Sequence, residues 1–221
     1  MKIKRTQTTL LIRTKDVVFP IDSIEFINTL SKNGYQITAR PPPSAPVGTM
    51  LEIYGEVARK TGASVEIDGE KKHVLIRGNE SNTVISVFLD VLSIVKYNLS
   101  VDLEKNVLFY EGDGFYHIQG EKSPLETISK TESDVHLSLG KLFGISQVSP
   151  FSIHLFSTGS KVNSVNWFDM SIKPLLPNQT ETTYDLTLVL RTENKSNLLN
   201  ILEGIEQKMS KVIEILEQKS T

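Results

Sequence analysis

The chain of 221 residues contains no cysteine. Disulfide bonds, thiol nucleophiles and thiolate metal sites are therefore excluded together. A reducing cytoplasm is the compartment that this composition favours, and the lack of cysteine beside many Lys, Glu and Ile residues also suits a thermophilic source. Any functional site must therefore consist of side chains that carry oxygen or nitrogen.

Long apolar runs are missing as well. The sequence has no stretch of about 18 apolar residues that would cross a bilayer as a helix. The apolar stretch nearest the N-terminus, Leu10-Leu11-Ile12, ends at Arg13 and is too short for the core of a signal peptide. We therefore expect a soluble, cytoplasmic protein that makes no contact with a membrane.

The sequence has no excess of positive charge either. Its formal net charge is -2 at pH 7, whereas a protein whose main task is to neutralise phosphates is usually basic. This balance disfavours nucleic acid as the partner unless basic residues gather locally in the fold. The residues that would have to gather are Arg40, Arg59, Lys60, Lys71, Lys72 and Arg77.

Motifs for metal binding and for common catalytic sites are also absent. The four histidines (His73, His117, His136 and His154) are far apart, and none has a second histidine two or four residues away. The patterns G-x-S-x-G, H-E-x-x-H and G-x-G-x-x-G do not occur. We predict no catalytic residue, no cofactor and no metal. An enzyme with an unfamiliar carboxylate site stays open, because catalytic groups from distant positions can meet in space.

One stretch, GFYHIQGEKS from Gly114 to Ser123, resembles a phosphate-binding loop. Five residues rather than four separate its glycines, and Glu121 places a carboxylate where phosphate charge would lie. The pattern therefore favours a turn at Gly112-Asp113-Gly114, a short strand, and then a helix with Ser123 as its N-cap. We expect no nucleotide at this position.

The first half of the chain predicts strands and two helices. Between Thr49 and Thr61 both a helix and a strand fit the apolar spacing, and Gly55 favours the strand because it costs a helix about 1 kcal/mol. The expected elements are a strand over Thr8–Thr14, a helix from Asp22 or Ser23 to Asn33-Gly34, a strand over Tyr35–Arg40, an extended proline-rich segment over Arg40–Gly48, strands over Ala63–Asp68 and His73–Arg77, and a long apolar helix that begins at Asn79 or Ser81.

The second half predicts a similar order. Its elements are a hairpin of Asn98–Leu103 and Val107–Tyr110, helices over Pro124–Lys130 and Ser133–Phe143, strands over Phe151–Phe156, Ser164–Lys173 and Thr182–Arg191, and a long helix from Lys195 to Gln218. We therefore predict an α+β fold of two similar halves, residues 1–97 and 98–221, each an antiparallel sheet backed by helices.

This order, with strand, helix, strand meander and long helix occurring twice, resembles the pseudo-symmetric saddle of the TATA-box-binding proteins. The segment ASVEIDGEKKHVLIRGNESNTVISVFLDVL is similar to the last hairpin and long helix of one repeat of that family, and the pattern extends over Thr8 to Lys96. The resemblance implies a pseudo-duplicated saddle, and it implies DNA binding through the sheet.

A second resemblance starts from the same residues. The segment GEVARKTGASVEIDGEKKHVLIRGNESNTV is similar to the helix–strand–strand–helix end of a KH domain, which would require a helix over Thr49–Thr61. That family clamps nucleic acid with a G-x-x-G loop. Here Val47-Gly48-Thr49-Met50 lacks the second glycine, so nucleic-acid binding by this route is in doubt.

Alternation along the expected strands identifies the side chains on the face without helices. Six of them are acidic and three are basic, so this face is poorly suited to bind DNA. We therefore favour non-catalytic binding of a protein partner, with a nucleic-acid-binding regulator of either resembled type as the alternative. The candidate interaction residues are Glu52, Glu66, Asp68, Arg77, Trp167, Asp169 and Asp185, and the same face carries Glu56, His154, Lys173, Thr187 and Arg191.

The C-terminal helix carries a second candidate surface. Apolar residues recur at spacings of four and three, the pattern of a heptad seam. The seam fits equally a contact with the sheet and a contact with a second copy or a partner. Its residues are Leu198, Leu202, Ile205, Met209, Val212 and Leu216.

Overall fold

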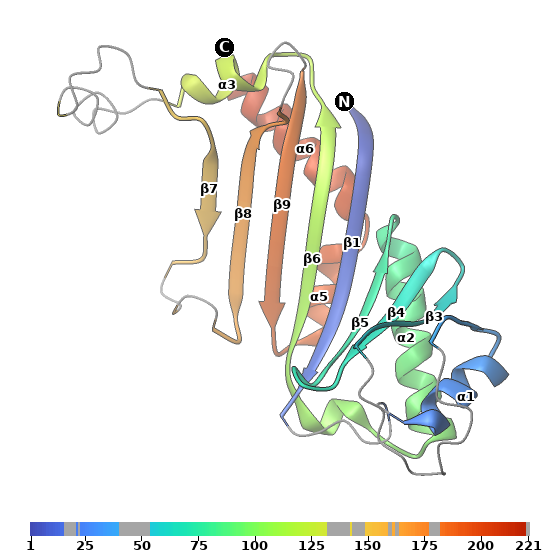
Figure 1. The fold of residues 1–221 in the computed structure, drawn as a ribbon. Coiled ribbons are helices and arrows are strands. Elements are labelled where there is room, and N and C mark those ends of the chain that lie inside the picture. The colour runs from blue at the N-terminus through green and yellow to red at the C-terminus, as the bar shows by residue number, and fades with distance from the viewer. Residues whose placement is uncertain are drawn as a thin grey trace.

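A computed structural model describes residues 1–15, 21, 23–39, 54–131, 142, 149–158, 161, 164–176 and 182–219. The chain is an α+β protein built on one antiparallel sheet of nine strands, in the order β2-β3-β4-β5-β1-β6-β9-β8-β7 (Figure 1). The elements are β1 (Lys2–Thr14), α1 (Ile24–Lys32), β2 (Gln36–Ile37), β3 (Tyr54–Lys60), β4 (Ala63–Asp68), β5 (His73–Gly78), α2 (Ser81–Asn98), a short 3-10 helix (Leu103–Asn106), β6 (Val107–Gln119), α3 (Pro124–Ser129), β7 (Ile153–Phe156), β8 (Trp167–Pro174), β9 (Thr183–Thr192), α5 (Lys195–Leu202) and α6 (Ile205–Lys219).

Helices cover one face of this sheet. In Figure 1, α2, α5 and α6 lie behind the strands. Strands β4 and β5 alternate strictly between buried and half-buried side chains, and the buried set, such as Val65 and Ile76, packs toward the helices. Burial of this apolar set is the main source of stability, at roughly 25 cal/mol per Å² of apolar area.

Several elements of the first half match the sequence prediction. Helix α1 begins after Ser23, whose hydroxyl accepts a hydrogen bond from the backbone N–H of Phe26, and it ends at Asn33 before Gly34, which has a φ of +82°. Residues 54–60 form a strand, β3, as Gly55 favoured. The predicted proline-rich segment 40–48 lies outside the described residues, and so does the predicted helix 133–143 apart from Leu142.

The predictions for the segment around β6 were wrong. Residues Asn98–Leu103 do not form a strand, because α2 continues to Asn98 and the 3-10 helix follows. The predicted turn at Gly112-Asp113-Gly114 lies in the middle of β6, which is continuous over 13 residues. Gly112 faces the helices, where a Cβ atom would lie 2.7 Å from Cδ1 of Leu202. The glycine therefore permits close helix packing and does not mark a turn.

Strands β1 and β6 join the two halves of the chain into one sheet. They pair antiparallel from Lys2 opposite Gln119 to Thr14 opposite Val107. On one side of this pair the strand order is β5-β4-β3-β2, and on the other it is β9-β8-β7. The halves therefore share a single continuous sheet, where the sequence predicted a separate sheet for each.

The predicted long C-terminal helix is two helices. The break falls at Glu203 and Gly204, which has a φ of +61° that favours glycine. The seam packs on the sheet: Leu198, Leu202, Ile205 and Met209 are buried, and Val212 and Leu216 are partly buried against the same core. An oligomeric contact through α6 stays a prediction, and it would use outward side chains such as Ile215, which is 48% exposed.

None of the helices within the described part of the chain is both long enough and apolar enough to cross a membrane.

Candidate functional site

The face of the sheet opposite α2, α5 and α6 carries the candidate site, and we call it the open face. Strand register places most of the residues predicted from the sequence on it. Glu52 lies outside the described residues. The residues placed on the open face are Glu56, Glu66, Asp68, Arg77, His154, Trp167, Asp169, Lys173, Asp185, Thr187 and Arg191.

Sequence reasoning missed the centre of this face. The expected first strand began only at Thr8, and the expected turn at residues 112–114 hid the alternation F-x-E-x-D-x-F-x-H of residues 109–117. That alternation was the sequence signal that could have identified the residues of β6 on this face. The missed residues are Arg5, Gln7, Thr9, Leu11 and Arg13 on β1, and Phe109, Glu111, Asp113, Phe115 and His117 on β6.

Most charges of the open face are paired with one another, either across neighbouring strands or within three residues of the same segment. Glu66 on β4 lies 3.1 Å from the guanidinium of Arg77 on β5. Arg191 on β9 donates from Nε to Oε2 of Glu111 on β6 at 2.5 Å. The other pairs are Glu56 with Arg59 at 2.6 Å, Asp68 with Lys71 at 3.2 Å, Asp169 with His154 at 2.8 Å, and Asp185 with Lys173 at 3.4 Å and His117 at 3.8 Å.

The acidic excess predicted for this face is therefore reduced. Strands β1 and β3 add Arg5, Arg13 and Arg59, whereas β6 adds Glu111 and Asp113. Acidic and basic side chains are then nearly equal in number on the described part of the face, and most neutralise one another. Paired charges of this kind contribute little stability where they are exposed.

Asp113 is the exception at the centre. Across the strands it lies in one row with Arg77, Thr9 and Val189. Among the described residues, no side chain makes an ion pair or hydrogen bond with its carboxylate. Burial, with Glu111 nearby, raises the pKa of the Asp113 carboxyl to about 7, and Arg191 and Arg77 only partly oppose this rise.

Two arginines of β1 also lack a carboxylate partner within the described part of the chain. The guanidinium of Arg5 lies 5.1 Å from the ring centre of Phe115, and that of Arg13 lies 5.7 Å from the ring centre of Phe109. These cation–π contacts orient the two groups over β6 and leave their N–H donors available. Unlike Arg191, which stacks on Phe109 at 4.3 Å and also binds Glu111, neither is neutralised.

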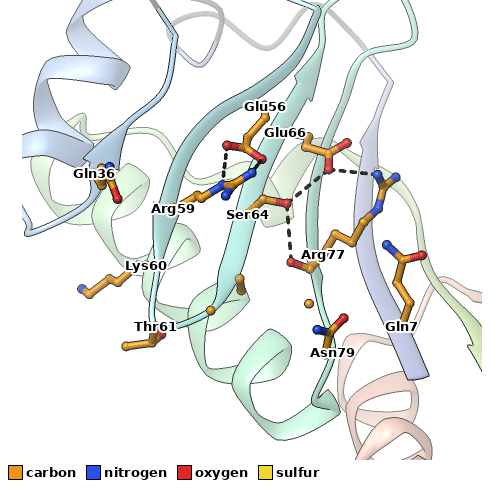
Figure 2. A pocket seen from close by; sticks show the side chains of 13 residues that line it. Gln7, Gln36, Glu56, Arg59, Lys60, Thr61, Ser64, Glu66, Arg77 and Asn79 are labelled. Carbon is orange, nitrogen blue, oxygen red and sulfur yellow. Dashed lines mark hydrogen bonds and ion pairs between the residues drawn. The ribbon is translucent and has the colours of Figure 1, made fainter. Parts of the chain in front are cut away.

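A groove of about 460 Å³ lies over β3, β4 and β5 and includes Gln7 of β1 (Figure 2). It contains the ion pairs of Arg59 and Arg77, and Ser64 donates a hydrogen bond to Glu66 at 3.2 Å. Three amide side chains line it without a hydrogen bond to any described residue, and each offers both a donor and an acceptor. These are Gln7, Gln36 and Asn79.

The other end of the open face is aromatic. Phe156 on β7 stacks on Trp167 of β8, with ring centres 6.1 Å apart and an interplanar angle of 21°. His154 meets the edge of Phe156. Phe156 is 56% exposed, whereas Trp167 is buried beneath it. An exposed aromatic ring held by a second ring is a typical anchor in protein interfaces.

The basic residues nominated for a nucleic-acid patch do not gather as free charges. Arg59, Arg77 and Lys71 are each paired with a carboxylate of the open face. Lys60 turns to the helix side, where Nζ lies 2.8 Å from Asp90 of α2. Lys72 donates to the backbone oxygen of Lys15, and Arg40 lies outside the described residues.

The stretch that resembles a phosphate loop binds a carboxylate of the chain itself. The backbone N–H groups of Glu121 and Lys122 donate to Glu217 of α6 at 3.1 and 3.0 Å. The hydroxyl of Tyr184 donates to the same carboxylate at 3.0 Å. These groups therefore fix α6 to the end of β6.

Within the described residues, no group of three His, Asp or Glu side chains converges on a possible metal position. His73 and His117 each lie near one aspartate, and burial lowers the pKa of His73. A scan of the chain against protein-family models finds no match, and a comparison with curated proteins finds no match either.

Proposed function

We propose that the protein is a non-catalytic binding module whose open face docks a protein partner. The observation that carries this proposal is the combination of a broad sheet face free of described helices with charges that are largely paired among themselves. Such a face offers hydrogen-bonding groups, aromatic rings and arginines without a strong field of either sign. Arginine and aromatic side chains are enriched in protein–protein interfaces.

Nucleic acid is the less suitable partner for this face. Binding to a phosphate backbone needs several free cations, since each neutralised phosphate releases a counterion. Arg59, Arg77 and Arg191 are already paired with carboxylates, and only Arg5 and Arg13 remain without one among the described residues of this face. Two separated guanidiniums beside the carboxylate of Asp113 would give weak binding at physiological salt.

We also propose that the fold is a pseudo-duplicated saddle of the TATA-box-binding type. Its support is the strand order. The first strands of the two halves, β1 and β6, lie side by side. The outer neighbour of each is the last strand of its own half, β5 beside β1 and β9 beside β6. A KH-like arrangement would need a helix where β3 is a strand. A shared fold does not carry over DNA binding, because function depends on the residues of the site.

The proposed protein partner can be tested by photo-crosslinking. A benzophenone amino acid would replace Gln7, which lies on the open face, and in a matched control it would replace the exposed Ser93 of α2. In extract from the source organism, we expect a discrete protein adduct through position 7 and none through position 93. We place the protein in a reducing cytoplasm because cysteine is absent, so cytoplasmic extract is the material of choice.

A second measurement distinguishes a protein partner from the alternative, a nucleic-acid partner. Fluorescence anisotropy would follow labelled duplex DNA, single-stranded DNA and RNA with the unmodified protein at low and physiological salt. We expect no binding that persists at physiological salt. Binding at physiological salt, or a nucleic-acid adduct through position 7, would replace the protein partner by nucleic acid.

A further inference from the structure

The charges of the open face that have no partner among the described residues follow a defined order. The guanidinium of Arg5 lies over Phe115, which is two residues from Asp113 along β6. The guanidinium of Arg13 lies over Phe109, which is four residues from Asp113 in the other direction. The sequence of free charges along β6 is therefore positive, negative, positive, at separations of roughly 7 and 14 Å from the rise per residue of a strand.

Each of these charges is held in place by the sheet. The two guanidiniums are oriented by their cation–π contacts, and the Asp113 side chain is enclosed by neighbouring strands. An unpaired, partly enclosed carboxylate destabilises the fold, so its position is not explained by stability. Groups that are fixed and unsatisfied in this way gain most from a complementary partner, since little ordering is needed on binding.

Resting on the proposed function, we infer that the partner presents a cation to Asp113 and an anion to each of Arg5 and Arg13. Both separations along β6 are even numbers of residues, and side chains two residues apart on an extended chain lie on the same face. An extended segment of the form acid-x-base-x-x-x-acid therefore places all three complementary charges toward the open face. The partner segment is thus an extended peptide with this charge order.

Three synthetic peptides test this inference directly. The first, Asp-Thr-Lys-Thr-Val-Thr-Asp, carries the inferred order. The second, Lys-Thr-Asp-Thr-Val-Thr-Lys, inverts the charges. The third, Asp-Lys-Thr-Thr-Val-Thr-Asp, keeps the composition of the first and moves the lysine to the opposite face of the strand. All three would be acetylated and amidated and titrated into isotope-labelled full-length protein at pH 8, where the Asp113 carboxyl is mostly ionised.

We expect the first peptide to bind roughly tenfold more tightly than the second, the sum of three modest exposed ion pairs, and about threefold more tightly than the third, which loses only the pair with Asp113. Shifted amide signals should centre on Thr9 and Asp113, which are register partners. The preference should weaken at pH 6, where Asp113 gains a proton; the charged groups that face it are Glu111, Arg77 and Arg191. The variant Asp113→Asn should lose the preference over the third peptide at both pH values and keep part of the preference over the second.

A charge-inverted variant supplies the positive control. With Arg5→Glu, Asp113→Lys and Arg13→Glu together, the protein should prefer the second peptide over the first by a similar factor. Circular dichroism and the thermal midpoint would establish that it is folded. Should the triple variant fail to fold, the single variant Arg13→Glu, which alters an exposed side chain, should reduce the preference for the first peptide about threefold.

Equal binding of all three peptides, or binding of none, would overturn the inferred charge order. Concentration-dependent dimers that Arg13→Glu abolishes would overturn it too, because a second copy of the chain would then occupy the face. In either case a protein adduct through Gln7 would leave the proposed function standing. Loss of that adduct together with salt-resistant nucleic-acid binding would instead remove the proposed function itself.

Discussion

Glu206 of α6 caps the N-terminus of α2 through Ser81, a residue 125 positions away in the chain. Its carboxylate accepts one hydrogen bond from the backbone N–H of Ser81 and one from the Ser81 hydroxyl, both at 2.7 Å. Glu80, at the N-cap position, makes no capping hydrogen bond of its own. The carboxylate also lies at the positive end of the α2 dipole. A helix of one half is therefore completed by a side chain of the other.

Removal of this cap should destabilise the protein. Glu206→Ala leaves the Ser81 N–H without its partner, and we expect a loss of about 1 to 3 kcal/mol in the free energy of unfolding. Urea unfolding would measure it, with the exposed Glu203→Ala as the matched control. A double-mutant cycle with Ser81→Ala should give a coupling of about 1 kcal/mol. Additive effects of the two substitutions would show that the contact between the Ser81 hydroxyl and the Glu206 carboxylate contributes nothing.

The carboxylate of Glu217 gives a second prediction on the same helix. It is buried and accepts hydrogen bonds from Glu121, Lys122 and Tyr184. In Glu217→Gln, one oxygen acceptor becomes an NH₂ donor that faces N–H groups, so we expect a loss of about 2 to 3 kcal/mol. The control is Glu214→Gln on the surface of α6, which should change the unfolding midpoint little. Equal effects at the two positions would contradict this account.

The short-range features of the fold were predictable from the sequence. Alternation identified β4 and β5, and the Ser23 cap with the Asn33-Gly34 ending fixed α1. These signals lie within a few residues of the element they define. They also placed the predicted polar residues of β4, β5, β8 and β9 on one face of the sheet.

The features of the fold that were predicted wrongly depend on residues far away in the chain. Gly112 resembled a turn residue, because the sequence does not reveal that Leu202, 90 positions later, fills the space where its Cβ would lie. Because a turn was predicted at residues 112–114, Asp113 was not assigned to the open face. The environment of Asp113 then could not be predicted, since its burial and its neighbours come from β1, β5 and β9. The residues of the candidate site on β6 were therefore missed because Gly112 was interpreted as a turn residue.

Gly112→Ala tests that reading of the glycine. The added Cβ would lie 2.7 Å from Cδ1 of Leu202 and 3.2 Å from Cδ1 of Leu198. We expect a loss of about 1 to 3 kcal/mol in stability from overpacking. In a Leu202→Ala background the same substitution should cost less, because the closest contact is then removed and only Leu198 stays near the added Cβ. Unfolding experiments on the four proteins of this cycle would measure the difference, and an unchanged cost would show that Leu202 is not the side chain that requires glycine at this position.

The pH dependence of stability should reveal the titration of the Asp113 carboxyl. An ordinary aspartate titrates near 3.8, and in the folded protein the pKa of Asp113 is raised to about 7. The folded state therefore binds the proton more tightly than the unfolded state, and stability falls as pH rises from about 4 to about 7. Above this window the ionised, unpaired carboxylate lowers the free energy of unfolding by roughly 2 to 4 kcal/mol.

Asp113→Asn removes this titration. The variant and the parent should be similarly stable near pH 4, and the variant should be more stable at pH 8, with the gap opening between these values. Urea unfolding across the range would measure it, with Asp169→Asn as control, since Asp169 is already paired with His154. A gap that stays constant from pH 4 to pH 8 would mean that Asp113 titrates alike in both states. A gap that opens as expected would mean that the fold keeps, at the centre of its open face, a carboxylate whose ionisation the described side chains do not compensate.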